Sequence, residues 1–180
     1  MNISKSIFKA YDIRGIVEED LTSEVIFLVG NVFGKKMTEM GLKKCVIGRD
    51  ARVSGLLLRT ALVEGLQLNN IEVLDLGVVP TPLVYFAAHY YKTGTGIVIT
   101  GSHNPTQYNG LKMMLNYEPF WGEQIKELFK QVVFLSKLEK KNKKFKKSSD
   151  IENFFLDDVY ISEIYKKVRI SRVSEEQIDG

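Results

Sequence analysis

Apolar residues recur along this chain with two alternating periods, one typical of helices and the other typical of strands. The helical period predicts helices over residues 21–40, 54–69, about 82–91 and 121–135. Short apolar runs predict strands over residues 44–48, 71–76, 95–100 and 110–115. Because helices and strands alternate, we expect an α/β fold: a three-layer α/β/α domain with a mixed, mostly parallel sheet.

Several residues with strong positional preferences support these elements. Thr22 or Ser23 can cap the start of the first helix, and Gly41 can end it. Pro82 suits the first turn of the third helix. In the second helix one face is apolar, and we expect it to be buried: Leu57, Leu58, Ala61, Leu62 and Leu66.

A change in composition divides the chain after its last predicted helix. Residues 1–136 form the predicted domain, and the lysine-rich residues 137–149 read as a solvated linker. Residues 150–180 follow, with apolar side chains near helical spacing: Ile151, Phe154, Phe155, Val159, Ile164 and Val168. Since little chain remains to cover that helix face, we expect it to be the first helix and tail of a truncated second domain.

Net charge, apolar runs and the cysteine count limit the partners and the cellular location that we expect for the chain. The chain has 180 residues, of which 44% are hydrophobic, and its net charge is +3, so the total charge gives no reason to expect nucleic-acid binding. We see no signal peptide and no apolar run long enough to cross a bilayer, so we expect no membrane partner. A single cysteine, Cys45, excludes a disulfide framework and favours a reducing, cytoplasmic location.

Three polar loops punctuated by glycine carry the candidate chemistry. Residues 97–105 (IVITGSHNP) run from an apolar strand into a turn that presents Ser102 at the open end of the sheet. Residues 8–15 (FKAYDIRG) and 48–55 (GRDARVSG) each place acidic and basic side chains beside glycine. Right-handed crossovers would bring the loops at Asp50 and Ser102 to one edge.

The sequence around Ser102 has two interpretations. A phosphoserine there would need cations and backbone N–H groups, and His103, Lys112 and Arg14 could supply positive donors. The alternative is a polar turn after a strand, with a local Asp–Arg pair in residues 8–15 and, in residues 48–55, charges after a strand followed by a helix cap. The residues alone leave both readings open.

Other serine and phosphate chemistries fit poorly. Asn104 stands where the second glycine of a G-x-S-x-G nucleophile elbow belongs, and the only histidines are His89 and His103. The run from Gly30 to Lys35 has three residues between its glycines, where a Walker loop has four, and it falls inside a predicted helix.

Four segments together resemble one family. FKAYDIRG, GRDARVSG, VPTP and TGSHNPTQYNGLK cover residues 8–112 in order and spacing similar to the N-terminal domain of the α-D-phosphohexomutases. The opening FKAYDIRG favours the phosphomannomutase/phosphoglucomutase branch over the phosphoglucosamine mutases.

The resemblance implies a reaction. Ser102 would be the phosphoserine that donates its phosphoryl group to a mannose or glucose monophosphate, through a hexose 1,6-bisphosphate that also serves as activator. Mg²⁺ would bridge the phosphoserine and three aspartates, so Ser102 would contribute to the metal only through its phosphate. Arg14 would lie near the transferring phosphate, Lys112 would act as an acid/base or electrostatic group, His103 would assist, and Tyr11 would line the site.

The resemblance also implies that much of the enzyme is elsewhere. The metal-binding aspartates, sugar recognition and substrate-phosphate binding belong to three further domains, II–IV, which this chain does not contain. We therefore expect the chain to be inactive alone. The alternatives are a phosphoglucosamine mutase domain, a non-catalytic sugar-phosphate-binding module and a degenerate fragment.

Overall fold

The fold is built on one mixed sheet. The computed structural model describes residues 3–139, 152–153 and 159–160. Within them the strand order is β1-β5-β4-β2-β3-β7, with β6 paired to β5. β2 pairs in parallel with β3 and β4, and β7 in parallel with β3, whereas β5 runs antiparallel to β1, β4 and β6. The strands are β1 (Ile13–Ile16), β2 (Lys44–Arg49), β3 (Glu72–Val78), β4 (Gly96–Ile99), β5 (Tyr108–Leu115), β6 (Glu118–Pro119) and β7 (Glu152–Asn153).

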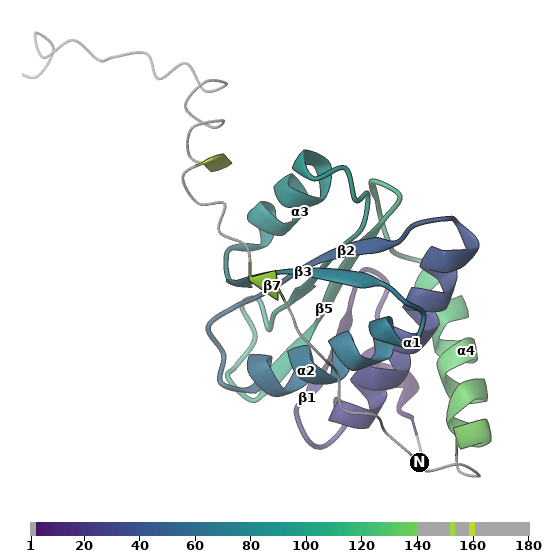
Figure 1. Ribbon diagram of the computed structural model, residues 1–180. Helices are drawn as coiled ribbons and strands as arrows, with labels where there is room; N and C mark the ends of the chain where they lie inside the picture. The colour runs from purple at the N-terminus through teal and green to yellow at the C-terminus, as the bar shows by residue number, and fades with distance from the viewer. Residues whose placement is uncertain (1–2, 140–151, 154–158, 161–180) are drawn as a thin grey trace, which may run out of the picture.

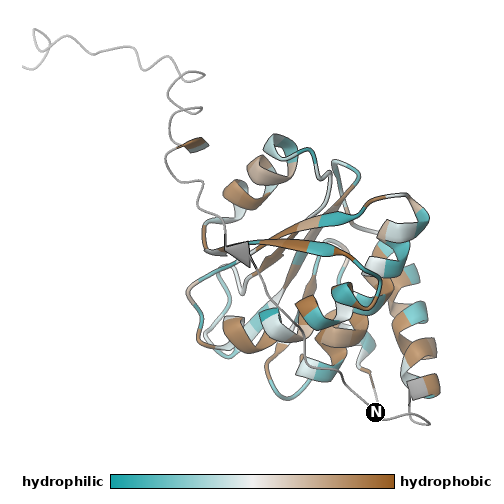
Figure 2. Ribbon diagram, in the orientation of Figure 1, coloured by the Kyte–Doolittle hydropathy of each residue, from teal (hydrophilic) through white to brown (hydrophobic). Residues whose placement is uncertain are grey.

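Helices cover both faces of the sheet, as Figure 1 shows. One face packs against α1 (Ser23–Glu39), α2 (Ser54–Gln67) and α4 (Glu123–Glu139), and the other against α3 (Thr81–Tyr90). A short 3₁₀ helix, η1 (Lys5–Ile7), precedes β1. The sheet separates two clusters of buried apolar side chains, and the apolar positions of Figure 2 concentrate on the strands and the helix faces turned toward them. The predicted three-layer α/β/α architecture is confirmed.

The signals at the ends of α1 act as predicted. Thr22 is the N-cap, and its side-chain oxygen accepts a hydrogen bond of 3.4 Å from the backbone N–H of Val25. Gly41 follows the helix with a φ of +74°, a left-handed conformation that glycine adopts without strain.

The glycines of the Walker-like run serve helix packing. Gly30 lies inside α1 and faces Gly65 of α2. A Cβ on Gly65 would overlap the backbone of Phe27 and Asn31, so the two helices are as close as backbone atoms permit. This contact, rather than phosphate binding, explains the glycines.

Two expectations about particular residues are corrected. Leu57 is 48% exposed, whereas its predicted companions Leu58, Ala61, Leu62 and Leu66 are buried. Glu152–Asn153 form strand β7 where helical spacing predicted a helix, because parallel pairing with β3 is available to them. Val159 and Tyr160 are helical and pack against the α3-side cluster, and the other residues of that predicted helix lie outside the described residues. The predicted division into a domain of residues 1–136, a linker of residues 137–149 and a truncated second domain of residues 150–180 stays a prediction, although α4 continues to Glu139, past the start of that linker.

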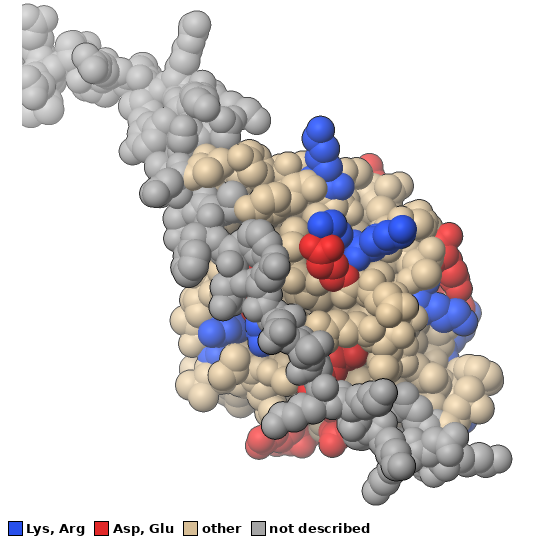
Figure 3. All heavy atoms as spheres, viewed as in Figure 1, with Lys and Arg blue, Asp and Glu red and all other residues tan. Residues whose placement is uncertain are grey.

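The surface has no dominant charge on the face drawn in Figure 3, where blue and red side chains are scattered among uncharged ones. In the part of the chain that the structure describes, no helix is long and apolar enough to cross a membrane.

Candidate functional site

The carboxyl ends of β2 and β4 meet at one edge of the sheet. Arg49 pairs with Ile99 across the two strands, and the N–H of Asp50 donates to the carbonyl oxygen of Ile99 over 2.9 Å. The loops that follow these strands therefore adjoin, as the crossover rule predicts.

Ser102 is exposed on the second of these loops and has a φ of +53°. A left-handed conformation costs a non-glycine residue roughly 1–2 kcal/mol, so the surrounding structure must hold it. Its N–H donates to the Thr100 hydroxyl over 2.8 Å, and the N–H of Asn104 donates to the Gly101 carbonyl over 3.1 Å. The Ser102 hydroxyl lies 3.4 Å from Nδ1 of His103, which is also exposed.

Asp50 joins the two loops. Its Oδ2 accepts hydrogen bonds of 2.9 Å from both the Thr100 hydroxyl and the Gly101 N–H, and its Oδ1 accepts one of 3.1 Å from the Arg52 N–H. Partial burial alone would raise the pKa of Asp50, but these hydrogen bonds and the positive charge of Arg52 lower the pKa below its ordinary value. Asp50 is therefore ionised at neutral pH.

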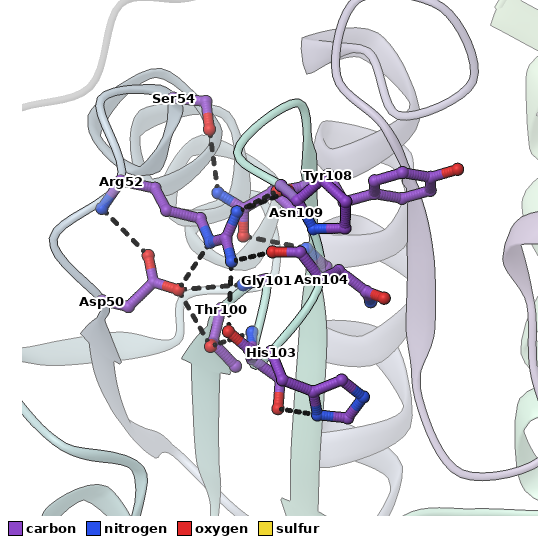
Figure 4. A network of polar contacts seen from close by, with 12 residues as sticks. Asp50, Arg52, Ser54, Thr100, Gly101, His103, Asn104, Tyr108 and Asn109 are labelled. Carbon is purple, nitrogen blue, oxygen red and sulfur yellow. Dashed lines mark hydrogen bonds and ion pairs between the residues drawn. The ribbon is translucent and has the colours of Figure 1, made fainter.

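Arg52 lies at the centre of the network in Figure 4. Its Nε donates to Oδ2 of Asp50 over 3.1 Å. Its other contacts are with backbone carbonyl oxygens of the serine loop: Ser102 at 3.1 Å, Asn104 at 2.6 Å, Pro105 at 2.7 Å and Tyr108 at 3.2 Å. One side chain from the β2 loop thus holds the loop that carries Ser102.

Asn109 ties the far end of the serine loop to α2. It is fully buried at the second residue of β5, and its Nδ2 donates to the Ser54 hydroxyl over 2.9 Å. Its Oδ1 accepts a hydrogen bond of 2.8 Å from the Gly110 N–H. Both ends of the loop are therefore anchored.

Two cations share one carboxylate on the α3 face of the sheet. Oδ2 of Asp12 accepts from Arg14 over 2.6 Å and from Lys112 over 3.3 Å. Arg14 in β1 pairs with Gly110 in β5, two residues from Lys112, which puts both side chains on one face. Arg14 is only 8% exposed, and among the described residues its Nη1 has no hydrogen-bond partner. A buried guanidinium with an unused donor suits an anionic ligand.

A hollow of about 410 Å³ opens beside Lys112, a size suited to a small ligand. Tyr11 and Trp121 stack at its rim, with ring centroids 5.9 Å apart and an angle of 11° between the rings. Tyr85 lies in it, and burial and the negative charge of Asp12 raise the pKa of its phenol, which keeps the phenol protonated. Its lining residues are Tyr11, Tyr85, Lys112, Met113, Pro119, Phe120 and Trp121.

The predicted site residues thus fall into two groups. Ser102 and His103 are on the loop, whereas Arg14 and Lys112 both pair with Asp12, and Lys112 and Tyr11 line the hollow. Backbone pairing places Arg14 two strands from Thr100, a separation of about 10 Å between the chains. No contact in the described part of the chain joins Ser102 to Arg14 or Lys112, so their joint action stays a prediction.

Several residues of the site were not foreseen individually. The local pair Asp12–Arg14 matches the alternative interpretation of its loop, and Asp50–Arg52 is a second local pair. The bridging roles of Asp12 and Arg52 were missed, as was Trp121. The glycine-punctuated charges of GRDARVSG were the available signal for Arg52, but its partners are carbonyl oxygens that every residue has.

The described residues contain no group of three or more His, Cys, Asp or Glu side chains arranged to hold a metal ion.

Comparison with known proteins identifies the family. A sequence model described as "Phosphoglucomutase/phosphomannomutase, alpha/beta/alpha domain I" matches residues 5–134. The chain therefore belongs to the phosphoglucomutase/phosphomannomutase family and contains its first α/β/α domain, as the resemblance indicated.

Particular relatives show how much of the family's length is present. A phosphoglucomutase from Neisseria meningitidis is 47% identical over 127 residues, which are 71% of this chain and 28% of that protein. A phosphomannomutase/phosphoglucomutase from Pseudomonas aeruginosa is 41% identical and is covered to 27%. The crystal structure of a family protein from Burkholderia thailandensis matches with a TM-score of 0.81 and 37% identity, over 95% of this chain and 38% of that one. The chain thus spans little more than a quarter of these curated relatives.

Proposed function

We propose that this chain is the serine-carrying domain of a phosphohexomutase that interconverts the 1- and 6-phosphates of mannose or glucose. The observation that carries the proposal is the Ser102 hydroxyl, exposed at the carboxyl edge of the sheet on a loop whose backbone is fixed by Arg52. A rigidly placed, accessible hydroxyl is what a phosphoryl carrier needs, because phosphoryl transfer depends on positioning and charge stabilisation.

The proposed step moves one phosphoryl group between two oxygens. The bond from Ser102 Oγ to phosphorus breaks while a bond from a free sugar hydroxyl to phosphorus forms, which gives a hexose 1,6-bisphosphate. The proton of that sugar hydroxyl passes in the end to the serine oxygen. Transfer of the other phosphate from the reoriented bisphosphate to Ser102 then yields the isomeric product.

The side chains around Asp12 have proposed roles in this step. Arg14 would stabilise the charge on the transferring phosphoryl group, and its unpartnered Nη1 supports that role. Lys112 would accept or return the sugar proton, or stabilise charge, at the edge of the hollow. Tyr11 would contact the sugar, and His103, beside the Ser102 hydroxyl, would assist transfer.

We also propose that the complete enzyme has further domains beyond this one. The relatives are more than three times as long as the matched segment, which supports further domains II–IV that read the sugar and supply aspartates for Mg²⁺. This chain would add only an oxygen of the Ser102 phosphate to that metal. Cys45, buried in β2 with its thiol pKa raised by burial, fits the proposed cytoplasmic location.

The alternatives receive less support. The relatives named above are phosphoglucomutases and phosphomannomutases, which favours these hexoses over glucosamine phosphate. A non-catalytic binding module or a degenerate fragment would bind a sugar phosphate or nothing, but would not take a phosphoryl group on Ser102.

Intact-mass analysis separates these functions. The 180-residue chain is incubated with glucose 1,6-bisphosphate and Mg²⁺, and peptide mapping locates any added phosphoryl group. We expect one phosphoryl group on Ser102, none on Ser102→Ala, and no mutase turnover by either chain. An unmodified chain, or a phosphoryl group retained by Ser102→Ala, would contradict the proposed function.

A further inference from the structure

Every donor of the Arg52 guanidinium is occupied. An arginine has five N–H donors. In this chain Nε donates to Asp50, Nη1 donates to the carbonyls of Pro105 and Tyr108, and Nη2 donates to those of Ser102 and Asn104. We infer that Arg52 is the positioning residue of the phosphoryl-transfer site: its guanidinium fixes the backbone of residues 102–108 and so sets the place of the Ser102 hydroxyl.

This arrangement distinguishes Arg52 from an arginine that binds phosphate. A guanidinium without a free N–H cannot take a phosphate oxygen unless it releases the loop. Arg14 differs, because its Nη1 has no partner among the described residues. Of these two arginines, Arg14 has capacity for an anion, whereas Arg52 is fully used by the protein.

The orientation of the carbonyls has a further consequence. In a trans peptide the N–H points opposite to the preceding C=O. The Ser102 carbonyl points at Arg52, so the His103 N–H points away from the guanidinium, and in the described part of the chain it has no hydrogen-bond partner. Arg52 therefore turns a free backbone donor outward next to Ser102, where it can serve a phosphoryl oxygen on that side chain.

Two neighbours fix the guanidinium itself. Asp50 holds Nε and the backbone N–H of Arg52, and it also binds Thr100 and Gly101. Gly101 lies against the guanidinium so closely that a Cβ there would overlap Arg52 side-chain atoms. A side chain at position 101 would thus displace the guanidinium from its present position, so the glycine before the serine lets Arg52 reach the loop carbonyls.

The inference rests on the proposed function for its chemical meaning, and its test uses two separate readouts on the 180-residue chain. Hydrogen exchange of the amides of Gly101, Ser102 and Asn104 reports the loop. The initial rate at which glucose 1,6-bisphosphate phosphorylates Ser102 reports the chemistry. The variants are Arg52→Ala, Arg52→Lys, Gly101→Ala and the double variant Gly101→Ala/Arg52→Ala.

Arg59→Ala is the matched control. Arg59 donates to Asp75 from Nε over 2.7 Å, and its side chain is 16% exposed, against 15% for Arg52. The Arg59→Ala variant therefore removes a similar Arg–Asp pair, between α2 and β3, without changing a contact of the serine loop. Melting temperatures of all variants are measured so that loss of folding is separated from loss of position.

We expect Arg52→Ala to speed exchange of the three loop amides and to slow phosphorylation on the order of 100-fold, the cost of a misplaced reacting group. Arg52→Lys should behave alike, because an ammonium has three donors and no planar fork. Methylguanidinium added to Arg52→Ala should restore part of the rate. Gly101→Ala should resemble Arg52→Ala, and the double variant should be no worse than either single variant. Arg59→Ala should change neither readout.

Three results would overturn the inference: unchanged loop exchange and phosphorylation in Arg52→Ala, equal loss in Arg59→Ala, or additive losses from Gly101→Ala and Arg52→Ala. If the wild-type chain takes no phosphoryl group, the proposed function fails. The exchange of the loop amides still decides in that case whether Arg52 positions the loop.

Discussion

The serine loop and the hollow beside Lys112 lie on the same sheet but differ in how many of their polar groups are already paired within the protein. In the loop, the side chains of Asp50 and Arg52 form their hydrogen bonds with other groups of the protein. Beside the hollow, Asp12 pairs with two cations: Arg14 keeps an unused donor, and Lys112 lines the hollow, where two exposed aromatic rings stack. The difference indicates that the loop supplies position, whereas the hollow supplies free charge and surface for a ligand.

The two regions should therefore respond differently to substitution. A saturated network loses geometry when one member is removed, because the acceptors left behind lose their donor, and those of Asn104 and Tyr108 are partly buried. An unsaturated cluster loses binding capacity, except where the removed group balances a buried charge.

Asp12→Ala should be the most destabilising of these changes. It removes the only described ion-pair partner of Arg14, which is buried in the sheet, and an uncompensated buried charge costs about 3–5 kcal/mol. Urea unfolding measures the loss. The control is Glu72→Ala, which breaks the exposed pair with Lys44 and should cost less than about 1 kcal/mol. Equal stability of the two variants would show that Asp12 does not balance Arg14.

Asp50→Asn should weaken the loop in a pH-dependent way. The folded chain lowers the pKa of Asp50 below its ordinary value of 3.8, so its stabilising effect is present above that pH and is lost as the pH falls through the lowered pKa. We expect a loss on the order of 1 kcal/mol at pH 7, since the group is partly exposed, and a smaller difference from wild type below pH 3. Urea unfolding at both pH values measures it. A difference that stays constant from pH 7 to pH 3 would contradict the assignment.

Elements defined by local signals could be predicted from the sequence, whereas those that depend on distant parts of the chain could not. The helix capped by Thr22 and ended by Gly41 was predictable because both signals are local. β1 was missed because only four residues form it and its partner, β5, lies far along the chain. Leu57 fits the apolar face of α2 by spacing, but spacing alone does not show where the covering surface ends.

The candidate site shows the same difference between local signals and contacts that depend on the fold. Ser102, Lys112 and Arg14 were predicted as site residues from their residue types and motifs, and their roles stay predictions. The contacts of Arg52 were not, because backbone carbonyls have no sequence signature and the four that it binds follow from the path of the loop. Asp12 was visible as a local partner of Arg14, but its bond to Lys112 needs the β1–β5 register.

Lys112→Met should leave stability almost unchanged. The side chain is partly exposed and its contact with Asp12 is long, so we expect a change below about 1 kcal/mol. Phosphorylation of Ser102 should nevertheless slow, because the hollow loses its cation. Thermal melting and the phosphorylation rate measured on the same sample separate the two effects. A large fall in melting temperature with an unchanged rate would make Lys112 a structural residue.

The smallest energetic effect belongs to the exposed rings, and it comes with a direct optical readout. Trp121 is the only tryptophan of the chain, so all tryptophan fluorescence comes from this one residue in the lining of the hollow. It is 54% exposed and stacks on Tyr11, which is 71% exposed, so Tyr11→Ala should shift the emission while changing stability by less than about 0.5 kcal/mol. Glucose 1-phosphate should alter the wild-type emission, Lys112→Met should weaken that response, and Arg52→Ala should retain it. Because Arg52 contacts the serine loop and none of the rings, an equal loss of the response in Arg52→Ala would mean that the loop and the hollow form one coupled unit rather than two.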